Sequence, residues 1–246
     1  MVRVDRHFLP GQIWHLTHRC HQQEFLLKFV KDRQRWLYWL FQAKKRYGLK
    51  ILNYMVTSNH IHLLVLADAE NRNAIPESLQ LIAGQTAQDY NRRKNRKEAF
   101  WEDHYHATAI QNKEHLKNCI VYMDLNMVRA GVVRHPGEWE HGGFAEIQNP
   151  PKRYGLIDFK SLIHLIEIKD YGSLKSLHRK WIDDALKKNE FTRESKWTEN
   201  IAVGDKLFIE IIRKLLGIQA KGRKTENAGR PDAENALCWN FSREVY

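Results

Sequence analysis

The feature that most constrains the fold of this chain is a pair of β-prone runs in ILNYMVTSNHIHLLVLAD, residues 51–68. The two runs flank residues 57–59, and this pattern predicts two strands joined by a short turn. His60 and His62 stand two positions apart at the start of the second run. Because alternate side chains of a strand point to the same face, both imidazoles are expected on one face of the sheet.

The elements predicted around this hairpin follow a recognisable order. Their sequence β-α-β-β-α-β-α begins with the six elements of the split βαβ, or ferredoxin-like, arrangement. We therefore expect an α+β fold, a ferredoxin-like or RRM-like antiparallel sheet with helices on one face. The other face is expected to be free for a ligand, as in modules that lay single-stranded nucleic acid across a sheet. The further β-prone runs cover residues 11–20 and 106–112, and the helical patterns cover 31–50, 75–93 and 112–130.

A Pro/Gly break in NPPKRYG, residues 149–155, predicts a boundary in the chain. We predict one domain over residues 1–149 and a basic, mainly helical C-terminal extension over residues 150–246. Within the extension, helices are expected at 159–169 and 205–217, and a partly disordered tail at 219–246.

The chain is strongly basic, with 40 Lys and Arg against 29 Asp and Glu and a formal net charge of +11. A folded protein of this charge most often binds a polyanion, usually nucleic acid, although charge can also serve solubility alone. No apolar run reaches the roughly 18 residues of a membrane-spanning helix. The first residues lack the pattern of a secretory signal, and three widely spaced cysteines do not predict a disulfide framework. We expect a cytoplasmic protein without a membrane partner.

A second chemical feature lies in the helix predicted over residues 112–130. Tyr122 and Asn126 are four positions apart and so share one helix face. If the two histidines meet this face, two nitrogens and an amide oxygen are available to a divalent ion beside a tyrosine nucleophile. Such ligands suit Mg²⁺ or Mn²⁺, and imidazole favours Mn²⁺. The alternative is a surface pair, His60 and His62, with Tyr122 as a packing residue.

Two weaker candidates lie near these residues in the sequence. His104 and His106 form a second His-x-His pair, but no long apolar strand follows them. Asp103 and Asp124 are carboxylates that could contact the metal ligands without binding the ion themselves.

Taken together, SNHIHLLV and YMDLNMVRAGVV resemble the HUH single-tyrosine transposase family, and in particular its REP-associated tyrosine transposases. That family places His-hydrophobic-His on a central strand. Its catalytic tyrosine lies on a later helix, in a segment like Tyr-Ile-x-x-Asn-Pro-Val-(Lys/Arg)-Ala-Gly-Leu-Val. Met127 stands where the family usually has proline, which affects how the helix ends. The resemblance covers about residues 8–148, including FWEDHYHATAI, and the matching positions of the second segment are Tyr122, Asn126, Val128, Arg129, Ala130 and Gly131.

The resemblance implies a bacterial, nucleoid-associated enzyme that binds hairpin-containing single-stranded DNA, then cleaves and rejoins it through a 5′-phosphotyrosine intermediate. It makes Tyr122 the catalytic nucleophile, and His60, His62 and Asn126 the ligands of Mg²⁺ or Mn²⁺. The long basic extension favours a monomer over a homodimer. One alternative is a non-catalytic protein that binds structured DNA or RNA on the same fold. Replication initiators and relaxases are less favoured, because the sequence has no Walker P-loop.

Positive charge is concentrated just before Trp101. This basic run would attract phosphates, and Trp101 could stack on a base. The alternative is a solvated loop with Trp101 in the core. Arg19 ends the tripeptide THR, which resembles a Thr-x-Arg position of the family. The candidate DNA-binding residues are Arg19, Arg92, Arg93, Lys94, Arg96, Lys97, Trp101 and Arg129.

Overall fold

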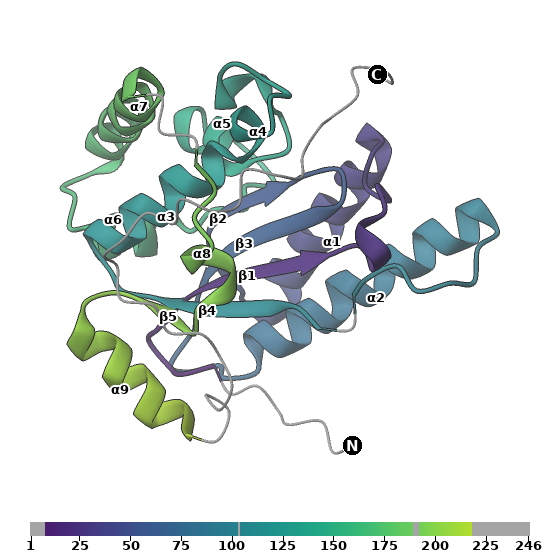
Figure 1. Ribbon diagram of the computed structural model, residues 1–246, viewed down its shortest axis with the longest axis horizontal. Coiled ribbons are helices and arrows are strands. Elements are labelled where there is room, and N and C mark those ends of the chain that lie inside the picture. The colour runs from purple at the N-terminus through teal and green to yellow at the C-terminus, as the bar shows by residue number, and fades with distance from the viewer. Residues whose placement is uncertain (1–7, 103, 189–191, 218–246) are drawn as a thin grey trace.

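A five-stranded sheet forms the centre of the computed structural model, which describes residues 8–102, 104–188 and 192–217 (Figure 1). The strand order is β2-β3-β1-β4-β5. Neighbouring strands from β2 to β4 pair antiparallel, whereas β5 pairs parallel with β4. The strands are β1 (Ile13–Arg19), β2 (Lys50–Val56), β3 (His60–Leu66), β4 (His106–Ile110) and β5 (Ala202–Val203).

Two long helices, α1 (Val30–Tyr47) and α2 (Ala74–Lys94), pack against each other behind the sheet in the view of Figure 1. Helix α1 ends as predicted at Gly48, whose φ of 69° lets its N–H bond the Lys44 carbonyl. The apolar faces of both helices pack against the strand side chains that point to the side of the sheet opposite His60 and His62.

The opposite face of the sheet is covered by α3 (Glu114–Asp124) and α8 (Lys196–Glu199). Figure 1 shows α8 lying in front of the sheet, across β1 and β4. His62 lies on this face, because its ring centroid is 6.1 Å from that of Tyr122 on α3. Two helices that follow β4 in the chain thus pack on the histidine face.

The predicted α+β class and the ferredoxin-like order of the first four strands are confirmed. Two details of that prediction were wrong. The sheet is mixed because β5 joins it in parallel, and helices cover both faces because α3 and α8 pack on the face expected to be free. Neither contact is visible in local periodicity, since each joins segments far apart in the chain.

The single helix predicted over residues 112–130 was also wrong in detail. It is divided at Leu125 into α3 and a short α4 (Asn126–Arg129). Leu125 has φ −78° and ψ 4°, outside the helical region. Tyr122 and Asn126 therefore belong to different helices rather than to one helix face.

The C-terminal part of the chain is built into the same core. Trp197 on α8 is 1% exposed and belongs to the main apolar cluster, and β5 extends the sheet. The two helices predicted in the extension are confirmed as α6 (Phe159–Ile166) and α9 (Lys206–Leu216). Helices α7 (Tyr171–Lys188) and α8 of the extension, and α5 (Gly143–Gln148) before it, were not predicted.

The predicted tail, residues 219–246, lies outside the described residues. No helix among those that are described is long and apolar enough to cross a membrane. The remaining elements are the short helices η1 (His21–Gln23) and η2 (Pro136–Glu138).

A buried polar pair ties this later part of the chain to the end of α3. His178 on α7 donates from Nε2 to Asp124 Oδ2 at 2.7 Å, and both side chains are fully buried. Asn53 on β2 donates to the other carboxyl oxygen of Asp124 at 3.0 Å, and Gln148 donates to His178 Nδ1 at 3.0 Å. The pair lies directly before the break at Leu125, so it fixes the end of the helix that carries Tyr122.

Replacing His178 by alanine is expected to lower the free energy of unfolding by roughly 3 kcal/mol or more, because it leaves a buried carboxyl group without a main partner. Urea denaturation would measure the change. The matched control is Lys180→Ala on the exposed side of the same helix, which should change stability by less than about 0.5 kcal/mol. A His178→Ala protein as stable as this control would contradict the role of the pair.

Candidate active site

Three imidazoles lie side by side on the face of the sheet that α3 and α8 cover. His60 and His62 on β3 point the same way, and their Nε2 atoms are 3.1 Å apart. His15 on β1 places its Nε2 2.9 Å from His62 Nδ1, and its own Nδ1 2.8 Å from the Trp197 carbonyl oxygen. His15 is fully buried and His62 is 2% exposed. The strand prediction that His60 and His62 share a face is confirmed.

Hydrogen bonding determines which nitrogens of these rings carry protons. A carbonyl oxygen can only accept, so His15 donates from Nδ1 to Trp197 and accepts at Nε2 from His62 Nδ1. His60 Nδ1 lies 2.7 Å from Asn59 Oδ1. The Asn59 amide nitrogen donates to the Gln23 carbonyl, which orients that oxygen toward His60. His60 and His62 are thus left with unprotonated Nε2 atoms that face each other.

The rings are held in their neutral form. Burial lowers the pKa of His15 to about 4 and the pKa of His60 to about 3. Burial also lowers the pKa of His62 well below its usual value, with the other two histidines as further causes. Neutral imidazole is the form that binds metal ions.

The residues present fit a divalent ion. Two nitrogens about 3 Å apart are at the spacing expected when each lies roughly 2.1 Å from one ion. Asn126 places its amide nitrogen 3.1 Å from His62 Nε2. A half-turn of this amide would present Oδ1 instead, so Asn126 can serve as the third ligand. No cluster of three or more His, Cys, Asp or Glu suited to a metal occurs within the part of the chain that the structure describes.

Tyr122 lies beside the histidines although the helix break separates it from Asn126. Its ring centroid is 6.1 Å from that of His62, and the side chain is 6% exposed. Burial raises the pKa of Tyr122, while the positive charges of Arg129 and Arg193 act in the opposite direction. The Arg129 guanidinium lies 4.2 Å from the Tyr122 ring centroid and donates to the Tyr122 carbonyl at 2.9 Å. The phenol is therefore neutral at rest, with cations placed to stabilise its phenolate.

Three arginines give the site a positive potential. After burial, the charges of Arg19, Arg193 and Arg129 are the next causes of the low pKa of His60. Arg19 is exposed at the end of β1, directly opposite His60 in the strand register. Guanidinium groups around one point are suited to bind the oxygens of a phosphate.

The other predicted DNA-binding residues lie elsewhere, at the end of α2 and in the loop after it. Arg93 forms an ion pair with Asp32, and Arg96 pairs with Glu98 at 2.7 Å. Arg92, Lys94 and Lys97 are exposed, with no ion pair in the described ranges. The structure thus brings Arg19 and Arg129 to the histidine site, whereas the basic run lies at the end of α2 and in the loop that follows it.

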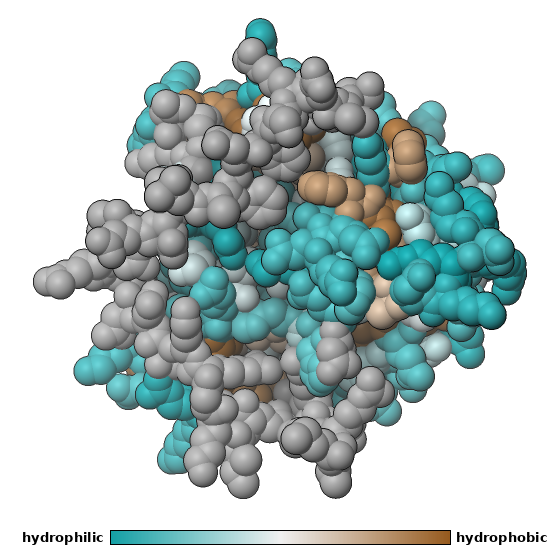
Figure 2. Space-filling view, turned by 45° about the vertical axis from the view of Figure 1, so that its right-hand side comes forward, coloured by the Kyte–Doolittle hydropathy of each residue, from teal (hydrophilic) through white to brown (hydrophobic). Residues whose placement is uncertain are grey.

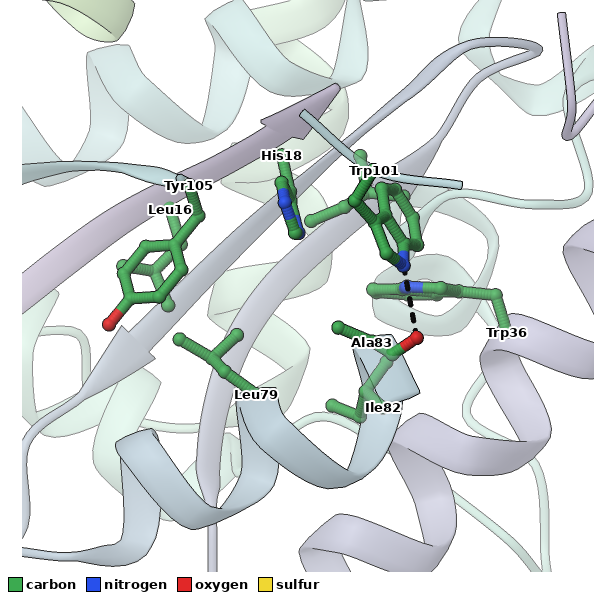
Figure 3. A pocket seen from close by; sticks show the side chains of 9 residues that line it. Leu16, His18, Trp36, Leu79, Ile82, Ala83, Trp101 and Tyr105 are labelled. Carbon is green, nitrogen blue, oxygen red and sulfur yellow. Dashed lines mark hydrogen bonds between the residues drawn. The ribbon is translucent and has the colours of Figure 1, made fainter. Parts of the chain in front are cut away.

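Trp101 packs between the sheet and α2, on the face opposite His60 and His62 (Figure 3). Its indole N–H donates to the Ala83 carbonyl at 3.0 Å, and its ring stacks on His18 with centroids 4.5 Å apart. These contacts favour the packing interpretation of Trp101.

The two weaker candidates do not join the site. His106 Nε2 lies 3.2 Å from the Asn200 carbonyl oxygen, and His104 is exposed. Asp124 contacts Asn53 and His178 instead of the metal ligands. Asp103 lies outside the described residues.

Sequence reasoning missed three residues that adjoin the site, namely His15, Arg193 and Trp197. The contact of His15 with His62 depends on the register of β1 and β3, which the sequence alone does not give. Trp197 and Arg193 lie in the extension, where no motif marks them. Only a predicted contact between α8 and the sheet could have identified them.

The fold and the convergence of a tyrosine with two histidines are features of single-tyrosine transposases. Residues 11–124 match the family model described as "Transposase IS200 like", and this part of the chain belongs to that family. The family consists of tyrosine nucleases of single-stranded DNA that typically use a divalent metal. The matched region contains His60, His62 and Tyr122, and ends two residues before Asn126.

Two solved structures are similar to this chain. One is a REP-associated tyrosine transposase bound to a REP hairpin, with 17% sequence identity, a TM-score of 0.49, and coverage of 65% of this chain and 95% of that one. The other is a candidate transposase from Deinococcus radiodurans R1, with 16% identity, a TM-score of 0.35, and coverage of 48% of this chain and 92% of that one. No curated protein matched the chain.

Mn²⁺ is expected to bind the protein at one site and to raise its thermal stability. Ligand at 100 times its Kd stabilises a folded protein by about 2.7 kcal/mol. The His62→Ala variant should lose this response because it removes a central ligand. The control is His164→Ala, an exposed histidine on α6, which should bind Mn²⁺ like the unmodified protein. Electron paramagnetic resonance of free Mn²⁺ would measure the binding, and equal affinity in both variants would contradict the site.

Proposed function

We propose that this protein is a metal-dependent single-stranded DNA endonuclease and strand transferase, with hairpin-containing DNA as its substrate. The observation that carries the proposal is the pair of unprotonated Nε2 atoms of His60 and His62, 3.1 Å apart beside Tyr122. Metal-ligand nitrogens, a tyrosine and surrounding arginines together match the needs of phosphodiester cleavage. One chain supplies all of these groups, which supports a monomer as the active form.

In the proposed reaction the Tyr122 hydroxyl oxygen attacks a DNA phosphorus and forms a phosphotyrosine bond. The bond from phosphorus to the 3′ oxygen breaks, that oxygen takes up a proton, and the phenol proton passes to solvent. Attack by a 3′ hydroxyl on the phosphotyrosine reverses these changes and rejoins a strand. The phosphotyrosine bond keeps the reaction reversible, because no free phosphate is released.

The side chains of the proposed site have different roles. His60, His62 and Asn126 would hold Mg²⁺ or Mn²⁺, which when bound polarises a phosphate oxygen. Arg129 lies over the Tyr122 ring, where its charge favours the phenolate. Arg19 at the open end of β1 is placed to bind a phosphate next to the one that reacts.

A second basic surface is proposed to hold DNA beyond the cleavage point. Phe29 is 52% exposed at the start of α1, and the Lys94 ammonium lies 5.6 Å from its ring centroid. Figure 2 shows apolar side chains enclosed by hydrophilic ones on the side of the molecule that is turned forward. Exposed aromatic rings among cations suit unpaired bases and their phosphates. The segment before α1 runs next to His60, since Leu27 N–H bonds the Ser58 carbonyl.

Within the predicted basic run we therefore distinguish two groups. Arg92, Lys94 and Lys97 are proposed to contact phosphates. Arg93 and Arg96 are proposed to contribute less, because carboxylates already neutralise them.

We expect a covalent protein–DNA adduct when hairpin-flanked single-stranded DNA, labelled at its 3′ end, is incubated with the protein and Mn²⁺. Denaturing gel electrophoresis would detect it. Tyr122→Phe should abolish the adduct because the nucleophile is gone, whereas the control Tyr38→Phe, at an exposed position of α1, should retain it. His60→Ala should abolish cleavage and leave hairpin binding largely intact. An adduct that persists in Tyr122→Phe would refute the nucleophile, and binding without any adduct in the unmodified protein would favour a non-catalytic DNA-binding protein.

The double variant Arg92→Ala with Lys97→Ala is expected to bind single-stranded DNA more weakly. Each lost phosphate contact should reduce the slope of log K against log salt concentration by about 0.7. Fluorescence anisotropy over a salt series would measure this slope. The matched control, Lys45→Ala with Arg46→Ala, removes two exposed cations at the other end of α1. Equal slopes in both double variants would contradict the proposed surface.

A further inference from the structure

We propose that His15 is a positioning residue of the metal site, and that the C-terminal extension orients the ligand His62 through it. The extension acts by way of the Trp197 backbone carbonyl. This inference rests on the proposed function, because it assigns a role to residues behind the proposed metal ligands.

The geometry of the two imidazoles supports a directed hydrogen bond. Their ring planes are within 8° of each other, with centroids 5.1 Å apart. A nitrogen of one ring then lies in the plane of the other, where the lone pair points, and the separation from His15 Nε2 to His62 Nδ1 is 2.9 Å. His62 is therefore fixed both in rotation and in tautomer.

The direction of the chain of hydrogen bonds is set at the Trp197 end. The carbonyl oxygen has no proton to give, so His15 must carry its proton on Nδ1 and accept at Nε2. His62 then carries its proton on Nδ1, and its Nε2 lone pair faces His60. The Trp197 carbonyl thus determines that His62 Nε2, rather than Nδ1, is unprotonated and available to an ion.

The carbonyl itself is held firmly. Thr108 on β4 donates to it at 3.2 Å and to the Asn200 carbonyl at 2.8 Å. The Ala109 N–H bonds the Ile201 carbonyl at 2.9 Å, which joins the segment after α8 to the sheet. The Trp197 ring also packs against the Tyr122 ring, with centroids 5.8 Å apart. Trp197 therefore contacts both His15, which supports the proposed ligand His62, and the proposed nucleophile Tyr122.

The test uses the full-length protein without DNA, so that metal binding is measured apart from catalysis. His15→Phe keeps a ring of similar size but cannot accept from His62. His15→Gln offers an amide donor and acceptor in place of the two ring nitrogens. Thr86→Val is the matched control, since it also removes a buried hydroxyl group but lies on α2, which packs on the other face of the sheet.

We expect His15→Phe to bind Mn²⁺ roughly 10- to 100-fold more weakly, the loss typical when a partner of a ligating histidine is removed. His15→Gln should recover much of this affinity, and Thr86→Val should bind like the unmodified protein. In ¹⁵N-correlated NMR spectra of the metal-free protein, His62 should carry its proton on Nδ1. That signature should disappear in His15→Phe and persist in Thr86→Val.

Three results would overturn the inference. The first is Mn²⁺ affinity in folded His15→Phe equal to that of the unmodified protein. The second is an unmodified protein in which His62 carries its proton on Nε2, which needs no variant to be folded. The third is equal loss of affinity in His15→Phe and Thr86→Val, since this would mark a general structural effect. These outcomes leave the proposed function standing, whereas an unmodified protein that does not bind Mn²⁺ would refute both.

Discussion

The arrangement of the site depends on the hydrogen bonds of three imidazoles, whose protons all point away from the space between His60 and His62. Burial makes their charged forms costly, so each ring must satisfy one nitrogen as a donor and leave the other as an acceptor. The Trp197 carbonyl and the Asn59 amide oxygen provide the two ends of this arrangement. What remains between them is a pair of unprotonated nitrogens on His60 and His62. Two facing acceptors gain nothing from each other, and an ion at the proposed metal site would satisfy both. In the free protein the Asn126 amide nitrogen lies 3.1 Å from His62 Nε2.

The C-terminal extension contributes to the candidate site through two contacts. The helix that carries Tyr122 is held at its end by the contact of Asp124 with His178 on α7, and on its face by Trp197 on α8. Both contacts come from beyond the Pro/Gly break. Loss of either contact would move Tyr122 relative to His62. In the proposed reaction, a displacement of about 1 Å would be enough to reduce the rate strongly.

Local patterns predicted the framework of the fold well. The alternation around residues 51–68 and the helical stripe of α1 are short-range features, and both elements formed where expected. The shared face of His60 and His62 follows from the two-residue period of a strand. The break at Leu125 could not be predicted in this way, because the i, i+4 spacing of Tyr122 and Asn126 assumes an unbroken helix. The pairing of His15 with Trp197 joins residues 182 positions apart, and no periodicity reports such a contact. The ion pair of Arg93 with Asp32 could not be predicted for the same reason, since the two residues are 61 positions apart.

The charges around the site connect metal binding with DNA binding. Arg19, Arg129 and Arg193 all act on His60, where they disfavour a further positive charge. A divalent ion placed at the histidines adds to this positive potential and is repelled by it. A DNA phosphate removes the conflict, because its oxygens can face the ion and the guanidinium groups at the same time. Since coupling between two bound partners is reciprocal, each should bind more tightly when the other is present. In the proposed function the site would therefore hold an ion and a phosphate together, next to Tyr122, whose raised pKa keeps its phenol neutral in the free protein.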